Sequence, residues 1–400
     1  MKLNRKHINF LFLIFLVYSC VEPFEFKTAG FESALVVEAS ISNEVKFQKI
    51  KLSRTYKLEN SGITNEIGAT VVVTDDKKNV YNFNELSPGE YTSNTPFAAV
   101  QNRNYQLTIT TSDNKSYTSN NQQIKSVSPI QNLTAKAITT NIGGIEKEGI
   151  SINVESYDSS RNSNFYRYEY EETYKIVAPY WSPSKLDVLS RRLPFRVRLI
   201  NRSANETKTC YTSNKSSRII QTETTSLSED KVNFSVNFLK KSDFKITNRY
   251  SILVKQYIQS IEAYTFYKIL NDLSSSESLF SQIQPGTLIG NIVSNDNANE
   301  NVLGFFEVSS VSSKRVFFNY SDFYQGDLPE HIEDCNFIAP SLVDRDFSPL
   351  IDELDRGNYI YYLENTGTIP NLVGPYLLVP KSCGDCTVLG SNIKPSYWVD

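Results

Sequence analysis

The sequence predicts a mostly β protein: an N-terminal immunoglobulin-like β-sandwich, then a second β-rich domain with one packed helix and an irregular C-terminal tail. Composition supports this fold class, because Tyr (24 residues) and Phe (23) are frequent while Met occurs once, and aromatic and β-branched residues favour strands. Short segments of alternating polar and apolar residues recur along the chain, separated by turn-forming residues. Only one segment has the apolar spacing that is typical of a helix.

The segment 34–128 carries the pattern of the predicted sandwich. Residues 105–111 (YQLTITT) alternate cleanly, and 69–75 (ATVVVTD) form an apolar run that ends in the turn Asp75–Asn79. Another turn follows at Ser87-Pro88-Gly89. About seven short strands, separated by turns every 8–12 residues or so, are typical of an immunoglobulin-like sandwich.

The second β-rich domain is predicted to occupy residues 129–400. Residues 165–174 (FYRYEYEETY) place their first three tyrosines on one face of a strand, which favours a half-buried sheet face over a ligand platform. Residues 258–273 (IQSIEAYTFYKILNDL) have helical spacing, so we expect a helix that packs on a sheet.

Two strands after the helix, 286–293 and 303–310, are expected to pair with each other. The loop between them, 294–301 (SNDNANEN), is rich in the oxygen ligands that Ca²⁺ prefers. It lacks the spacing and carboxylate density of a calcium-binding loop, so an Asn-rich hairpin is favoured.

The first twenty residues have the pattern of a bacterial secretion signal. Three basic side chains lie within the first six residues, the apolar run 8–17 follows, and Ser19 precedes Cys20. The run is shorter than the roughly 20 apolar residues that a helix needs to span a bilayer. A cysteine after such a run and a small residue resembles the lipobox of bacterial lipoproteins, whose thiol takes a diacylglycerol. We therefore predict a signal peptide at 1–19, a lipid anchor at Cys20 and a tether at 20–33; an ordinary secreted protein is the alternative.

Charge gives little further information about partners. The chain holds 41 basic and 44 acidic side chains, and loss of the basic signal would increase the acidic excess. A nucleic-acid partner would require a basic face, so we expect none, and we also expect no cofactor.

Four cysteines follow the predicted anchor: Cys210, Cys335, Cys383 and Cys386. An even number in an exported protein predicts two disulfides. The Gly-Asp turn between Cys383 and Cys386 favours a local bond, and bonds from these two cysteines to Cys210 and Cys335 are the alternative. A redox-active pair is not favoured, because no helical pattern follows that would lower a thiol pKa. Zinc is not favoured either, because the other two cysteines are far apart in the sequence.

His331 is the only histidine after the predicted signal. A Ser-His-Asp or Cys-His site would have to use it, but it lies in a polar loop without a recognised motif. A surface role is favoured, so the sequence predicts no catalytic residue and no metal ligand.

Aromatic residues are the candidate ligand contacts. Tyr180 and Trp181 lie in an irregular insertion, and Tyr397 and Trp398 lie at the C-terminal end. Aromatic faces stack on sugars and other flat groups, but core packing or tail anchoring is the alternative for each ring. The insertion also holds four arginines within 191–198, for which a solvated strand face is favoured over an anionic partner.

Several stretches, in their order along the chain, carry a family resemblance: Ser19-Cys20 followed by 35–38 (LVVE), 68–75 (GATVVVTD) ahead of 87–91 (SPGEY), 290–292 (GNI) with 303–306 (LGFF), and 383–386 (CGDC) running into 392–398 (NIKPSYW). The chain resembles, over nearly its whole length, an uncharacterised family of Bacteroidota outer-membrane lipoproteins that is defined as a domain of unknown function. Members are commonly encoded beside TonB-dependent receptors. The resemblance implies an accessory lipoprotein of such a transporter, and it brings no catalytic or binding residues.

Three functions are compatible with these patterns. The favoured one is a non-enzymatic, lipid-anchored protein that captures a ligand or assists a TonB-dependent transporter at the outer membrane, on either its periplasmic or its cell-surface side. A structural or adhesion protein is the alternative. A glycan hydrolase is less favoured, because it needs two facing carboxylates, and the many acidic residues, among them Glu169, Glu171, Asp352, Glu353 and Asp355, form no motif.

Overall fold

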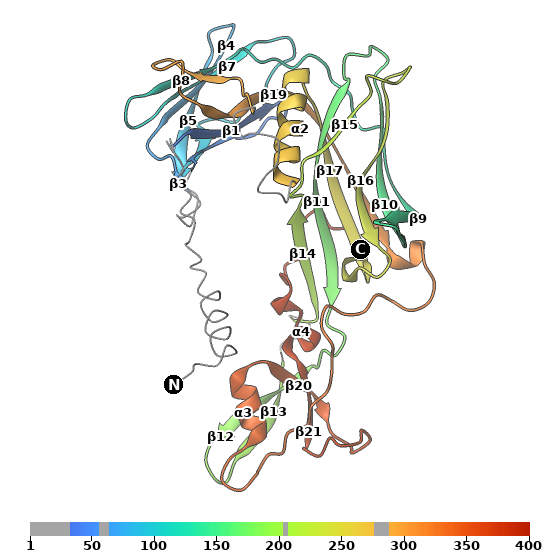
Figure 1. Ribbon diagram of the computed structural model, residues 1–400. Coiled ribbons are helices and arrows are strands. Elements are labelled where there is room, and N and C mark those ends of the chain that lie inside the picture. The colour runs from blue at the N-terminus through green and yellow to red at the C-terminus, as the bar shows by residue number, and fades with distance from the viewer. Residues whose placement is uncertain (1–32, 56–63, 203–206, 276–287) are drawn as a thin grey trace, which may run out of the picture.

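The computed structural model describes residues 33–55, 64–202, 207–275 and 288–400. The predicted signal peptide, the anchor Cys20 and all but the last residue of the tether lie outside these residues. Figure 1 shows two β bodies side by side and a smaller lobe at the opposite end from the first body. The protein is mostly β, as predicted.

The first body is a sheet that closes around one apolar core, which we call the first core. Side chains alternate between inside and outside, so that Leu35, Val37 and Ile41 of the first strand are buried. This is the two-residue period of a strand with one solvated face. Its strands from the N-terminal part of the chain are β1 (Leu35–Ser42), β2 (Lys49–Arg54), β3 (Thr64–Asn65), β4 (Thr70–Asp75), β5 (Val80–Ser87), β6 (Glu90–Ser93), β7 (Tyr105–Thr110) and β8 (Ser116–Ser119).

Two late strands complete the first body. β18 (Ile292–Ser294) pairs with β8, and β19 (Val302–Asn319) runs parallel to β1, with Val302 opposite Leu35. The first core therefore includes residues from early strands such as β1 and β2 and from the late strands β18 and β19, and it is not built from the segment 34–128 alone.

The predicted pairing of 286–293 with 303–310 is wrong. β18 pairs with β8 instead, and its neighbour Asn291 reaches β19 through its side chain, which bonds to the main chain of Phe306 in both directions at 2.8 and 2.9 Å. The part 286–287 lies outside the described residues. Gly304 explains the local geometry: its φ is +148°, and a Cβ there would lie 2.1 Å from the carbonyl oxygen of Val37.

The second body is a two-layer sandwich around a second core. One layer uses the second half of β19, and the other is a three-stranded sheet in the order β16-β10-β9. Tyr166 and Tyr168 point into the core between the layers, so the predicted tyrosine face is confirmed as a sheet face. The remaining strands are β9 (Asn132–Ile142), β10 (Ile145–Tyr157), β11 (Phe165–Val177), β14 (Thr209–Lys215), β15 (Ile220–Glu223), β16 (Lys231–Lys240) and β17 (Arg249–Ile258), with the short helices η1 (Phe244–Ile246) and η3 (Tyr320–Asp322).

The predicted helix is confirmed as α2 (Ile261–Ser275). It packs on the outer face of the β11–β17–β19 sheet, where Ala263 and Phe266 bury against Phe305. Among the described residues, no helix has both the length and the apolar character that crossing a membrane requires.

The distal lobe, by which we mean residues 184–201 and 338–380, has a small core around Leu350, Tyr361 and Leu378. The tail that looked irregular in sequence holds regular elements here. α3 begins at the cap Ser348, whose hydroxyl accepts from the Ile351 amide. The elements of the lobe and its junction are β12 (Ser184–Ser190), β13 (Arg196–Asn201), α3 (Pro349–Arg356), β20 (Tyr359–Glu364), β21 (Tyr376–Pro380), α4 (Lys381–Gly384) and η4 (Cys386–Val388).

Candidate functional site

A buried arginine lies where the two bodies meet. Arg167 of β11 is 8% exposed, and its guanidinium donates to Glu307 of β19 at 3.1 Å and to Glu169 of its own strand. The same group lies over the ring of Tyr257 at 4.2 Å, because Arg167 and Tyr257 are direct partners in the β11–β17 ladder. It also lies over the ring of Tyr267 of α2 at 5.1 Å.

Hydrogen bonds extend this charge network. Tyr257 donates to Glu169 at 2.9 Å, and the amide of Gln259 donates to Glu307 at 3.1 Å. Burial alone would lower the pKa of Arg167, but the carboxylates of Glu307 and Glu169 raise it. Burial would raise the pKa of Glu169, but the charge and hydrogen bond of Arg167, together with the hydrogen bond from Tyr257, outweigh burial and hold that pKa below its ordinary value. Both shifts favour the charged forms of Arg167 and Glu169, and a buried ion needs such a partner.

A cavity of about 300 Å³ opens beside the network. Four cationic side chains line it, Arg167, Lys215, Arg218 and Lys255, against two acidic ones. Tyr267 of α2 closes one side. Arg167 and Lys255 are paired with carboxylates, so Lys215 and Arg218 supply the positive charge that, with the aromatic walls, suits a small anionic ligand.

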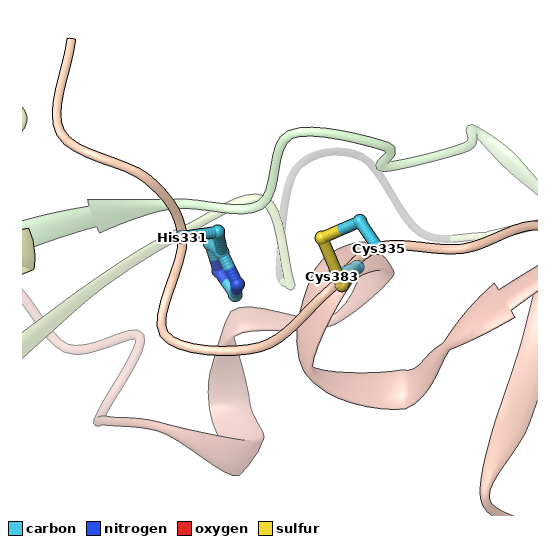
Figure 2. A group of neighbouring side chains, drawn as sticks. All are labelled: His331, Cys335 and Cys383. Atoms are coloured by element: carbon cyan, nitrogen blue, oxygen red, sulfur yellow. A yellow bond between two sulfur atoms is a disulfide. The ribbon is translucent and has the colours of Figure 1, made fainter.

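A second cluster lies at the junction with the distal lobe. Figure 2 shows the imidazole of His331 beside the disulfide between Cys335 and Cys383. One ring nitrogen and the two sulfur atoms lie within 4.8 Å of one another. The ring packs edge-on against Phe244 of η1, with the two ring centres 4.9 Å apart.

The two imidazole nitrogens have different surroundings. Nδ1 of His331 accepts weakly from the Glu333 amide at 3.4 Å, whereas Nε2 is buried and has no hydrogen-bond partner in the described part of the chain. Burial lowers the pKa of His331. Histidine and cysteine are the ligands that Zn²⁺ and Cu⁺ prefer, but sulfurs bonded to each other are not thiolates, so this cluster holds no metal site while the disulfide is closed.

The predicted local bond between Cys383 and Cys386 is wrong. Cys386 pairs with Cys210 and Cys383 pairs with Cys335, across 176 and 48 residues. Cys383 lies in α4, which ends at Gly384, and Cys386 begins η4, so only Asp385 separates the two short helices. Both disulfides therefore tie the C-terminal segment to distant parts of the chain.

The predicted ligand contacts lie in two different places. Tyr180 packs edge-on against Phe337 and Tyr362 at the junction, with ring centres 4.9 and 5.3 Å apart. Trp181 donates from Nε1 to Thr207 at 3.1 Å. Contacts within the protein therefore explain the positions of both rings, as the core-packing alternative expects.

The other two rings hold the C-terminal tail against the outer face of the second body. Trp398 is 5% exposed and packs edge-on against Tyr211. Tyr397 stacks on the guanidinium of Arg315 at 3.8 Å, and its hydroxyl bonds to Thr173 at 2.8 Å. These contacts fix the C-terminal tail to the second body, which is the tail-anchoring alternative to a ligand contact.

The loop 294–301 uses its carboxylates within the protein. Asp296 accepts from the Ser116 amide at 2.7 Å, while Glu300 accepts from Tyr117 and Lys115. Burial and the bond to Glu300 raise the pKa of Tyr117 to about 12. These contacts clamp the loop onto β8, and they use oxygens that a calcium ion would need.

The acidic residues weighed for glycan hydrolysis are mostly engaged with arginines. Asp355 pairs with Arg191 of the β12–β13 hairpin at 2.9 Å, and Asp352 pairs with Arg356 at 2.7 Å. The hydrogen bond from Arg191 lowers the pKa of Asp355. A general acid needs a raised pKa, so this geometry does not favour that chemistry.

Sequence reasoning missed both clusters. Arg167 and Glu169 alternate with the buried tyrosines, so they fall on the face of β11 that would normally be solvated. The signal available was α2, since a helix that packs on a sheet must cover one of its faces. For His331 no signal existed, because its neighbour Cys383 lies 52 positions further along the chain.

Fold and disulfides together define a disulfide-linked protein of two β bodies with a buried ion network at their seam. A family model described as a domain of unknown function (DUF4249) matches residues 21–315, and the chain belongs to this family. Comparison with curated proteins and with solved structures found no match.

Proposed function

We propose that this protein is a lipid-anchored, non-enzymatic lipoprotein of the bacterial outer membrane that assists a TonB-dependent transporter, either by docking to it or by capturing its ligand. The observation that carries the proposal is the short apolar run that ends at Ser19-Cys20. Acyl chains on Cys20 would anchor the protein, since each buried CH₂ contributes about 0.8 kcal/mol.

The position of the first body fits such an anchor. Residues 21–33 can span at most about 45 Å, so a lipid on Cys20 would keep the first body near the membrane. The distal lobe lies at the other end of the molecule (Figure 1) and would point toward a partner.

Two further points support the transporter as partner. Membership of the DUF4249 family fits the resemblance to lipoproteins that are commonly encoded beside TonB-dependent receptors. The basic cavity beside Arg167 supplies a place for a small anionic ligand.

The test combines fractionation with copurification. We expect wild-type protein to fractionate with the outer membrane and Cys20→Ser to move to the soluble fraction. The double variant Cys335→Ser/Cys383→Ser is the matched control, because it removes cysteines elsewhere in the chain and should stay with the membrane. A tagged wild-type protein extracted in mild detergent should bring down an outer-membrane receptor.

Two results would overturn the proposal. If Cys20→Ser associated with the membrane as strongly as wild type, Cys20 would not be the anchor. Lipidated wild-type protein that copurifies with no receptor would favour a structural or adhesion role.

A further inference from the structure

We infer that the cluster of His331, Cys335 and Cys383 is a redox-gated site for a thiophilic metal ion, Zn²⁺ or Cu⁺, which opens when the disulfide is reduced. Three ligand atoms of the right chemistry lie within 4.8 Å of one another. The buried Nε2 of His331 without a partner is a second and independent observation. A buried polar atom left unpaired costs free energy, and a metal bound through that nitrogen would remove the cost.

The two disulfides differ in accessibility. Cys210 and Cys386 are both completely buried, whereas Cys335 is half-buried on a loop. Thiol–disulfide exchange requires that an attacking thiolate reach one sulfur. The bond between Cys335 and Cys383 is therefore the one that a reductant reaches first.

The reductant is a dithiol, such as the active site of a thioredoxin-like protein. One of its thiolates attacks Sγ of Cys335, and Cys383 leaves as a thiolate. The second thiol of the reductant then displaces Cys335, so the reductant ends as a disulfide and this protein holds two thiols. Binding of a metal ion by both thiolates and the neutral imidazole releases the two thiol protons.

The backbone geometry suits this ligand set. The Cα atoms of Cys335 and Cys383 are 5.8 Å apart, and two sulfurs bound to one tetrahedral zinc lie about 3.8 Å apart, given Zn–S bonds of about 2.3 Å. Small side-chain rotations achieve that separation. Two cysteines and one histidine leave a fourth position for water, as in known Cys₂His zinc sites.

The consequence for the molecule is a cross-link that survives reduction. Cys335 lies on the loop that leads from η3 to the distal lobe, and Cys383 lies on α4, which follows β21. A metal ion bound to both would keep this junction closed after the disulfide opens. This second link at the junction, beside the bond between Cys210 and Cys386, would then depend on metal under reducing conditions and on the disulfide under oxidising conditions.

The test uses residues 21–400, which omit the predicted lipid-bearing Cys20 and so leave no other unpaired cysteine, and Co²⁺ as a spectroscopic probe. Mild reduction followed by alkylation and mass spectrometry should first show that Cys335 and Cys383 are free while Cys210 and Cys386 stay bonded. Anaerobic Co²⁺ should then bind one to one, with thiolate-to-cobalt charge transfer and tetrahedral d–d bands. The oxidised protein should show neither band.

Two variants make the test specific to these ligands. Cys335→Ser/Cys383→Ser should lose the charge-transfer band. His331→Ala should keep the thiolates but bind Co²⁺ at least about tenfold more weakly, with circular dichroism unchanged. A band that persists in the double serine variant, equal affinity in His331→Ala, or unfolding of the wild type on mild reduction would each overturn the inference.

Discussion

The first body and the distal lobe are held together in different ways. The first core is closed by a ladder in which β1 runs parallel to β19, and it contains residues from nine of the strands. The distal lobe has a core of a few side chains around Leu350, and disulfides hold the segment that follows it. A small core supplies little stability, and covalent links compensate for it in exported proteins.

The family match includes the first body but only the β12–β13 hairpin of the distal lobe. It covers residues 21–315 and so includes all of the first body, whereas α3, β20 and β21 lie beyond it. Three of the four bonded cysteines also lie beyond it. The covalent links are therefore concentrated in the part of the chain that lies outside the family match.

The largest effect is expected where the first body brings two backbones close together. In Gly304→Ala, the new Cβ would meet the carbonyl of Val37 and the backbone would keep a φ that favours glycine. Strain of about 1–3 kcal/mol and overpacking of similar size should together lower the free energy of unfolding by about 4 kcal/mol. Urea denaturation followed by circular dichroism measures this loss.

The matched control lies in the distal lobe. Gly357 has a φ of +72°, and a Cβ there would meet no atom within 4 Å. Gly357→Ala should therefore cost only the strain, about 1 kcal/mol. Equal losses in the two variants would contradict the view that β1 and β19 lie too close together to accept a side chain at position 304.

The difference between local patterns and long-range contacts also determines which elements could be predicted from the sequence. Strands such as 165–174 and the helix at 258–273 follow from local periodicity, which does not depend on the rest of the chain. The parallel pairing of β1 with β19 could not be predicted, because the two strands are more than 260 positions apart and many strands are equally apolar.

The candidate sites show this limit more strongly. Arg167 is recognisable as unusual only once α2 covers its face of β11. The turn between Cys383 and Cys386 locally favoured a bond that the two short helices α4 and η4 prevent. In both cases the decisive information is a contact between segments far apart in sequence.

The next largest effect is expected at the junction of the distal lobe. Cys210→Ser/Cys386→Ser opens a loop of 176 residues, which should cost about 3 kcal/mol. The loss should be local: hydrogen exchange should accelerate in β20 and β21 while protection in β1 and β7 stays the same. Faster exchange in β1 would show that the two regions unfold together.

The other disulfide provides the comparison. Cys335→Ser/Cys383→Ser opens a loop of only 48 residues, so the chain-entropy account predicts a loss smaller by about 1 kcal/mol. An equal or larger loss in this variant would mean that local contacts, rather than loop length, set the stability of the junction.

The smallest effect concerns a buried carboxylate in the first body and depends on pH. Asp75 accepts from the amides of Lys77 and Asn79, both at 2.9 Å, and pairs with Arg103 at 3.1 Å. Burial would raise the pKa of Asp75, but the hydrogen bonds from Asn79, Lys77 and Tyr81 outweigh it and hold the pKa below 3.8.

A folded-state pKa below the unfolded value of about 3.9 means that the charged form of Asp75 stabilises the fold above that pH. This contribution is lost as pH falls through the lowered pKa. Asp75→Asn should therefore reduce the free energy of unfolding by about 1–3 kcal/mol at pH 7, and the gap to wild type should close on acidification below about pH 4.

Asp355→Asn in the distal lobe should change little, because Asp355 is largely exposed and its pairing with Arg191 is screened by solvent. Urea titrations at several pH values measure both gaps, and a gap at Asp75 that widens in acid would contradict the sign.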